Sequence, residues 1–292
     1  MSSHQPGHTS SSLRKILTWL LKILLSALAL YLVYKKTDQQ VLLTLLKDMD
    51  WPWLIPAFLL FNASKIFSSI RLAGLLENIG IAPGHINNLK LYYKGMFYNL
   101  FLPGGIGGDI YKTYILNKGN DTPLKKIVGT MLYDRVSGLI MLGLITAVLV
   151  YDVMDAWKLY AAILVVITIP AGYTFTRVFF PSHRKNFSTS QVYSFAVQIS
   201  QVLAVVCILK ALQVKFMAYF SYLLLFMLSS IAAVVPVTVG GAGARELVFL
   251  YGKKLLHVSA ETGIAIGLIF FLITALSSFA GIFFKYKTTN EE

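Results

Sequence analysis

The sequence predicts an all-α polytopic membrane protein with about six spanning helices, two re-entrant broken helices and an inverted repeat. Of its 292 residues, 56% are hydrophobic and 13% are charged, whereas a soluble domain carries about 25% charged residues. Apolar runs of about 20 residues, the length that crosses a bilayer, recur along the whole chain. Two further apolar segments are broken by proline and glycine in the same pattern, which indicates duplicated halves.

The predicted spans are uninterrupted apolar segments: residues 16–34, 52–70, 127–150, 159–180, 188–209 and 261–284. Tryptophans lie near several of their ends, where aromatic belts meet lipid headgroups. Residues 1–15 form a polar tail, and no small-residue cleavage site follows the first apolar run, so we interpret this run as an uncleaved span. The connections are too short for a soluble domain. Residues 1–292 are therefore expected to form one membrane-embedded domain.

Segments 86–117 and 216–256 carry the two matching breaks. In each, a proline (Pro103, Pro236) is followed four residues later by two adjacent glycines, and ionisable residues come next. Matching broken segments point to an internal repeat, here with halves at about 16–150 and 159–285, and to a binding site between the halves. The glycines of the two breaks are Gly104, Gly105, Gly107, Gly108, Gly240, Gly241 and Gly243.

The charge pattern supports an inverted arrangement of the two breaks. With a cytoplasmic N-terminus and two re-entrant segments, the six spans return the C-terminus to the cytoplasm, and the breaks open toward opposite sides. More lysines and arginines then lie inside than outside, as the positive-inside rule requires. An alternative with residues 86–102 as a full span stays open. The formal net charge of +13 fits anionic lipid headgroups, and we expect no nucleic-acid partner.

The breaks also define the predicted substrate site. A broken helix at membrane depth turns its partly positive N-terminus toward the interior, and glycines let a phosphate or carboxylate approach the backbone. Two such breaks entering from opposite sides suit an anion. Arg245 is the foremost candidate for contacting an anionic headgroup, because its planar guanidinium matches phosphate oxygens. The structural alternatives are close helix packing at the glycines and an ion pair of Arg245 with Asp109 or Glu246.

Four further ionisable residues are candidates for gating or coupling: Asp109, Asp134, Arg135 and Glu246. Asp109 follows the first glycine break and begins a helical run, so capping of the helix N-terminus is its structural alternative. Asp134 and Arg135 diverge by about 100° on a helix, and each therefore needs a partner elsewhere. Snorkelling to the headgroups is an alternative for Arg135. Other polar residues within spans, such as Asn62, Lys65 and Gln198, are explained by hydrogen bonds between helices.

Several chemistries find no support in the sequence. Cys207 is the only cysteine, and the five histidines have no metal-ligand spacing, so we expect no metal site. Walker, nucleophile-elbow and zinc-protease motifs are absent from the sequence. We therefore expect neither a cofactor nor an enzymatic activity.

Three motifs resemble a known family, the lysylphosphatidylglycerol synthase transmembrane-region proteins. Residues 98–109 (YNLFLPGGIGGD) are similar to the family's F-x-N-x-x-x-P-G-G-x-G-G-D segment. Residues 134–139 (DRVSGL) are similar to its D-R-x-x-G-L stretch, and residues 235–246 (VPVTVGGAGARE) to its P-x-S-x-G-G-x-G-x-R-E motif. The motifs occur in family order, and the resemblance covers nearly the whole chain.

The resemblance implies a flippase-like, multi-pass protein of a prokaryotic cytoplasmic membrane that translocates lipids, and the predicted anion site points to an anionic phospholipid or a lipid-linked headgroup as its partner. In multiple peptide resistance factors this region accompanies a soluble aminoacyl transferase, for which we expect no counterpart after Lys287. The family often has an arginine three residues after the G-G-D aspartate; here that position is Lys112, which keeps the charge of a predicted substrate-binding residue but not the bidentate geometry. Transport of a small soluble anion, or a role as membrane partner subunit of a lipid-modifying enzyme, stays open, as does the oligomeric state.

Overall fold

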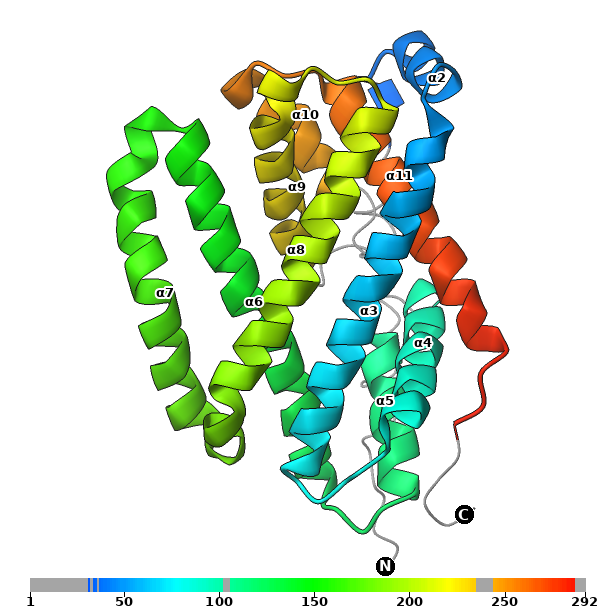
Figure 1. Ribbon diagram of the computed structural model, residues 1–292, viewed down its shortest axis with the longest axis vertical. Helices are drawn as coiled ribbons and strands as arrows, with labels where there is room; N and C mark the ends of the chain where they lie inside the picture. The colour runs from blue at the N-terminus through cyan, green and yellow to red at the C-terminus, as the bar shows by residue number, and fades with distance from the viewer. Residues whose placement is uncertain (1–30, 32–33, 36, 102–105, 235–243, 287–292) are drawn as a thin grey trace, which may run out of the picture.

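The structure, a computed structural model, describes residues 31, 34–35, 37–101, 106–234 and 244–286. Within these residues it contains helices and no strand, so the predicted all-α class is confirmed. The long helices run roughly along the longest axis of the molecule (Figure 1). The first predicted span, residues 16–34, lies almost wholly outside the described residues.

The described α-helices are α2 (Gln39–Lys47), α3 (Leu54–Glu77), α4 (His85–Phe101), α5 (Gly107–Lys118), α6 (Leu124–Val153), α7 (Lys158–Phe179), α8 (Phe187–Ala211), α9 (Tyr219–Val234), α10 (Ala244–Leu256) and α11 (Ala260–Phe279). Six described segments are long and apolar enough to cross a membrane: Trp51–Glu77, Leu124–Val153, Asp155–Phe179, Pro181–Ala211, Phe216–Val234 and Ala260–Ile282. Five of them coincide with predicted spans. The sixth contains α9 and falls in the first arm of the predicted broken segment 216–256.

The two broken segments form helix hairpins that enter the molecule from opposite ends. α4 and α5 occupy the lower half of Figure 1, and α9 and α10 the upper half. The hairpins are matched in length, with 17 and 12 residues in α4 and α5 and 16 and 13 residues in α9 and α10. Because α4 begins and α5 ends at the same end of the molecule (Figure 1), the structure favours re-entry of residues 86–101 over a full span.

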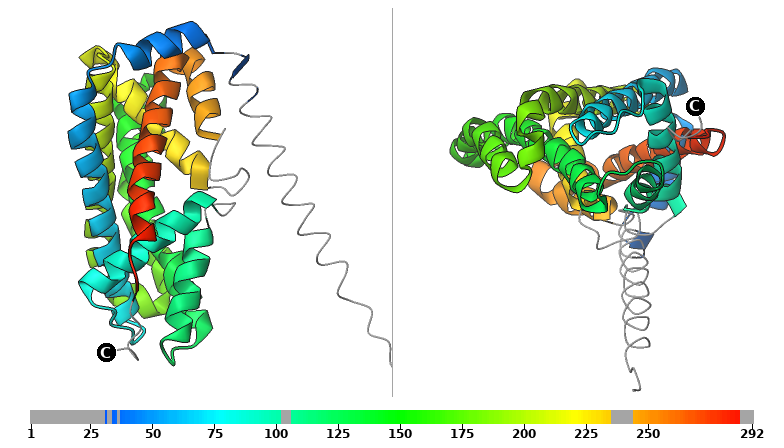
Figure 2. Two further views of the ribbon diagram at one scale, coloured as in Figure 1. Left: turned by 90° about the vertical axis from the view of Figure 1, so that its right-hand side faces the viewer. Right: turned by 90° about the horizontal axis from the view of Figure 1, so that it is seen from below.

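The inner ends of the two hairpins face each other about halfway along the long axis, as the left view of Figure 2 shows. α4 and α9 end there and α5 begins there, whereas α10 begins somewhat nearer the upper end of this view. The positive dipole ends of α5 and α10 are thus accompanied by the negative ends of α4 and α9. The helix dipoles therefore offset one another in part, and side chains determine the local charge.

The first hairpin is held by a backbone contact that only glycine allows. A Cβ atom on Gly108 would overlap the carbonyl oxygen of Gly95 and lie 2.6 Å from its carbonyl carbon. The amide of Gly108 also donates a hydrogen bond of 2.7 Å to the side-chain oxygen of Asn99. Close helix approach at small residues is typical of membrane proteins. The packing role considered for the glycines therefore applies at Gly108.

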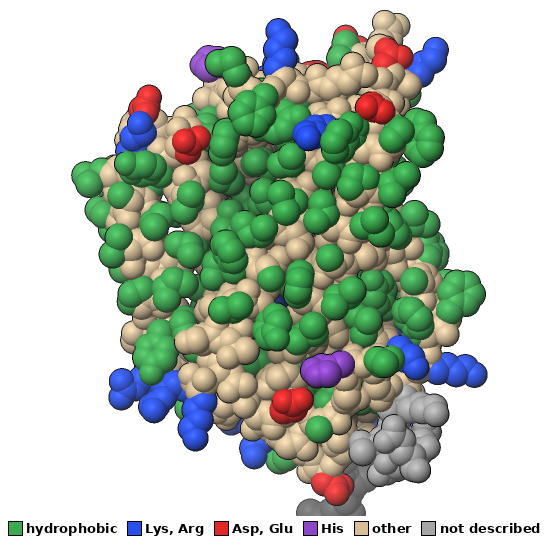
Figure 3. Space-filling model, in the orientation of Figure 1, with side chains coloured by type: hydrophobic (Ala, Val, Ile, Leu, Met, Phe, Trp, Pro, Cys, Tyr) green, Lys and Arg blue, Asp and Glu red, His purple; other side chains and the backbone are tan. Residues whose placement is uncertain are grey.

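Hydrogen bonds between the long helices occur at two of the predicted positions. The amide nitrogen of Asn62 on α3 donates to the Ser277 hydroxyl on α11 at 3.0 Å, and that of Gln198 on α8 donates to the Gly138 carbonyl on α6 at 3.3 Å. The surrounding surface is apolar in its middle part, with lysines and arginines gathered toward the two ends (Figure 3). This distribution fits a protein whose central belt lies in hydrocarbon.

Candidate functional site

Asp109, at the start of the first hairpin's second helix, lies between two cations. Its carboxylate pairs with the ammonium of Lys112 one turn later, at 2.8 Å, and with the guanidinium of Arg135 on α6. Ile106, and not Asp109, is the N-cap residue of α5. The capping alternative for Asp109 is therefore wrong, because its carboxylate pairs with Lys112 and Arg135 and α5 has no side-chain capping hydrogen bond.

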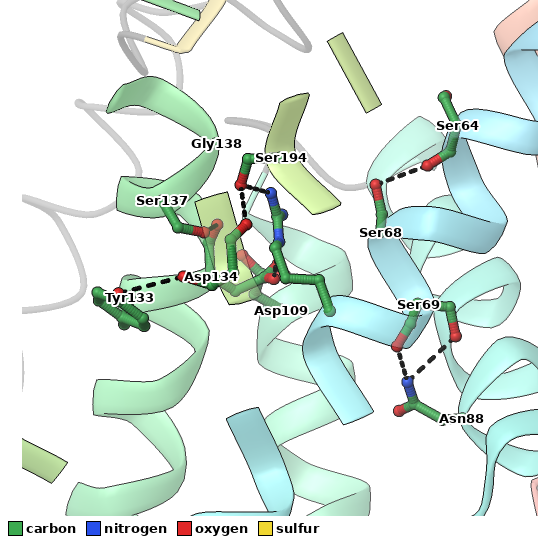
Figure 4. Close-up of polar contacts among 12 residues, drawn as sticks. Ser64, Ser68, Ser69, Asn88, Asp109, Tyr133, Asp134, Ser137, Gly138 and Ser194 are labelled. Carbon is green, nitrogen blue, oxygen red and sulfur yellow. Dashed lines mark hydrogen bonds and ion pairs between the residues drawn. The ribbon is translucent and has the colours of Figure 1, made fainter. Parts of the chain in front are cut away.

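Asp134 pairs with Arg71 on α3, and not with its sequence neighbour. The Nε atom of Arg71 lies 2.8 Å from Oδ1 of Asp134, and its Nη1 atom donates a 2.8 Å hydrogen bond to the Ser194 hydroxyl on α8 (Figure 4). Both charged side chains are buried, with 6% and 8% of their surfaces exposed. The prediction that Asp134 and Arg135 each have a partner elsewhere is confirmed. The resulting network ties α3, α6 and α8 together.

Arg71 is the residue of this network that the sequence analysis misses. The predicted span ends at residue 70, whereas α3 continues without interruption to Glu77. The signal was nevertheless present, since Ser64, Ser68 and Arg71 recur at intervals of four and three residues. This spacing places them on one face of a helix. Two serines and an arginine on the same face of an apolar helix indicate a polar contact with another helix inside the protein.

Lys112, which the sequence assigns to substrate binding, is buried beneath α4. Besides its ion pair with Asp109, its ammonium lies 5.0 Å from the centre of the Tyr92 ring. Only 7% of the Lys112 side chain is exposed, against 31% for Arg135. The contacts of Lys112 thus give it a structural partner, and substrate binding by this residue stays a prediction.

Arg245 lies in the first turn of α10, at the inner end of the second hairpin. Its guanidinium carbon lies 5.6 Å from the centre of the Phe270 ring on α11. Within the described part of the chain, no carboxylate forms an ion pair with Arg245 at 4 Å or less. Glu246 attracts it only at longer range. The ion-pair alternatives are therefore not found among the described side chains, because Lys112 and Arg135 occupy the carboxylate of Asp109.

The remaining predicted site residues are only partly described. Gly107 and Gly108 are buried in the first turn of α5, whereas Gly104, Gly105, Gly240, Gly241 and Gly243 lie outside the described residues. No cluster of three or more His, Cys, Asp or Glu side chains with the geometry to hold a metal ion occurs within the described ranges.

These features define a class of protein: a polytopic α-helical membrane protein with two opposed helix hairpins and charged side chains at their inner ends. Residues 19–192 and 175–281 match the family described as the lysylphosphatidylglycerol synthase TM region. The chain therefore belongs to this family, and the resemblance seen in the three motifs is confirmed. It matches none of the curated proteins. Membership relates the chain to membrane phospholipid metabolism.

Proposed function

We propose that the protein moves a lipid with an anionic or lipid-linked headgroup between the two leaflets, without catalysing a chemical reaction. The observation that carries this proposal is the position of Arg245, beside Phe270 in the middle of α11 and outside ion-pair distance of every described carboxylate. A cation at the centre of a bilayer costs at least about 2.5 kcal/mol. An anionic headgroup bound at Arg245 would offset that cost. Family membership supports a lipid as the molecule to which this headgroup belongs.

The opposed hairpins supply a route for alternating access. In this mechanism the headgroup passes between the inner ends of the hairpins while one half of the molecule rocks against the other. The Asp109–Arg135 pair joins the first hairpin to α6, and its breaking and re-forming would gate the movement. In this mechanism the ion pair between Arg71 and Asp134 holds α3 against α6, and these two helices stay together while the hairpin moves. Glu246, next to Arg245, would weaken its hold on the headgroup during release.

The proposed setting is the cytoplasmic membrane of a prokaryote, with both termini on the cytoplasmic side. The end of the molecule that contains the α5–α6 and α7–α8 connections then faces the cytoplasm. These connections carry basic residues that suit anionic headgroups on that side: Lys118, Lys125, Lys126, Arg184 and Lys185. A lipid-modifying enzyme is a candidate partner of the same membrane.

Lipid translocation in proteoliposomes tests the proposal. Labelled phospholipids with different headgroups would be compared for the native chain, for Arg245→Ala and for Lys210→Ala. Lys210 is a matched control, because its ammonium also lies over an aromatic ring, that of Trp53 at 4.3 Å, but at the exposed end of α8. We expect headgroup-dependent translocation that Arg245→Ala abolishes and Lys210→Ala retains. Absence of translocation for every anionic headgroup, from folded protein, would instead favour the partner-subunit role.

A further inference from the structure

A second cation, Lys65 on α3, lies in the region of Arg245. Lys65, in the middle of α3, places its ammonium 4.4 Å from the centre of the Phe61 ring. Its charge is close enough to that of Arg245 for the two to repel each other. In the described part of the chain, no carboxylate lies within ion-pair distance of Lys65. α3 and α10 therefore contribute one cation each to the same region.

The two cations rest on one aromatic pair. The rings of Phe61 and Phe270 meet edge to face, with their centres 5.4 Å apart. Lys65 lies over the first ring and Arg245 over the second. Cation–π contacts stabilise each charge, but by only about 0.5–2 kcal/mol. They hold the two side chains in place without neutralising either of them.

The neighbouring Arg71 differs from these two cations. It belongs to the same electropositive region, since its charge also repels that of Lys65, but Asp134 neutralises it. The local excess of positive charge therefore comes from Lys65 and Arg245. Glu246 attracts Arg245 only at longer range, and in a medium of low dielectric constant two like charges without an ion-pair partner favour a ligand that brings the opposite charge.

We infer that Lys65 and Arg245 together bind a phosphate group that carries two negative charges, as in a phosphate monoester or a diphosphate. This inference rests on the proposed function and narrows its substrate class, because a phosphodiester headgroup brings only one negative charge. The guanidinium supplies a planar pair of donors and the ammonium a point charge, a combination that suits phosphate oxygens. The Phe61 and Phe270 rings form the apolar floor under the bound group.

Lipid binding by the full-length protein in neutral detergent micelles tests the inference. Native mass spectrometry would compare phosphatidic acid, a phosphate monoester, with phosphatidylglycerol, a phosphodiester, for the native chain and for Lys65→Met. We expect the native chain to prefer phosphatidic acid by about tenfold, the difference expected for one more interaction with a charged group. Lys65→Met should lose this preference. Equal affinity of the native chain for the two lipids would overturn the inference.

Two further variants separate a binding effect from a folding effect. Lys65→Arg keeps the charge and should retain the preference for phosphatidic acid, whereas Lys210→Met removes a ring-stacked lysine from the exposed end of α8 and should change nothing. A loss of preference in both Lys65→Met and Lys210→Met would overturn the inference, since it would show a dependence on overall charge. If inorganic diphosphate displaces phosphatidic acid, a soluble anion also binds Lys65 and Arg245. If it does not, the phosphate group that binds there belongs to a lipid.

The inference and the proposed function fail in different ways. Translocation that Arg245→Ala abolishes but Lys65→Met leaves at the native rate and headgroup preference would overturn the role of Lys65 and support the proposed function. If the native chain prefers phosphatidic acid, Lys65→Met loses that preference, and no lipid is translocated, the dianion site is supported and the proposed function is overturned.

Discussion

The two helix hairpins are matched in length and opposite in direction, yet their charged residues have different surroundings. In the first hairpin, Asp109 neutralises Lys112 within α5 and pairs with Arg135 across to α6. In the second, Arg245 rests on an aromatic ring with no ion-pair partner among the described carboxylates. The comparison teaches that similar helix hairpins can serve different ends. In this structure the charges of the first hairpin form ion pairs, and under the proposed function the cation of the second is available to a ligand.

The largest expected effect comes from removing the acid of the first hairpin. Asp109→Leu leaves the buried ammonium of Lys112 without its partner, and we expect the free energy of unfolding to fall by about 3–5 kcal/mol. Equilibrium unfolding in mixed micelles of a mild detergent and dodecyl sulfate would measure this loss. The double variant Asp109→Leu/Lys112→Met should recover most of it. A loss below about 1 kcal/mol in the single variant would show that the pair does not stabilise the hairpin.

A smaller loss of stability is expected when a glycine of either hairpin is replaced by alanine, and the loss should differ between the two hairpins. Gly108→Ala forces a methyl group onto the backbone of Gly95, which cannot give way, and should cost about 1–3 kcal/mol. A Cβ atom on Gly252 in α10 would overlap Cδ2 of Leu225 and lie 2.9 Å from its Cδ1, but both atoms are the end of a side chain that can change rotamer. Gly252→Ala should therefore cost less than about 1 kcal/mol. Equal losses, measured as shifts of the melting temperature, would contradict the proposed difference in rigidity.

The smallest effect on stability is expected at the residue most important for the proposed function. Arg245→Gln removes a cation that no described acid neutralises, so the free energy of unfolding should change by less than about 1 kcal/mol. The same unfolding assay used for Asp109→Leu would measure it. A loss of several kcal/mol would place Arg245 in a structural ion pair and remove the contrast between the hairpins.

Local patterns in the sequence predicted the main features of the fold. The proline and glycine breaks after Pro103 and Pro236 predicted two re-entrant segments, and the structure has a hairpin at each. The 100° divergence of adjacent helical residues showed that Asp134 and Arg135 need separate partners. Such features depend on a few neighbouring residues, and for this reason they can be read without knowledge of the fold.

The missing parts of the site depend on contacts between distant segments. The partner of Asp134 is Arg71, which lies just after the predicted end of its span at residue 70, because a charged residue ends the apolar run although α3 continues to Glu77. From the sequence, Lys65 is expected among the residues that hydrogen-bond between helices, since nothing near it in the chain points to α10. Its relation to Arg245 arises only when α3, α10 and α11 pack around Phe61 and Phe270.

The position of the hairpin ends halfway along the molecule also has an electrical consequence. A charge bound between them has crossed about half of the voltage across the membrane, whichever side it entered from. At 100 mV this amounts to roughly 1.2 kcal/mol for each elementary charge, and twice as much for a dianion. An inside-negative potential would therefore favour arrival of an anion from the cytoplasmic side and oppose its return. Voltage alone would give such a carrier a preferred direction.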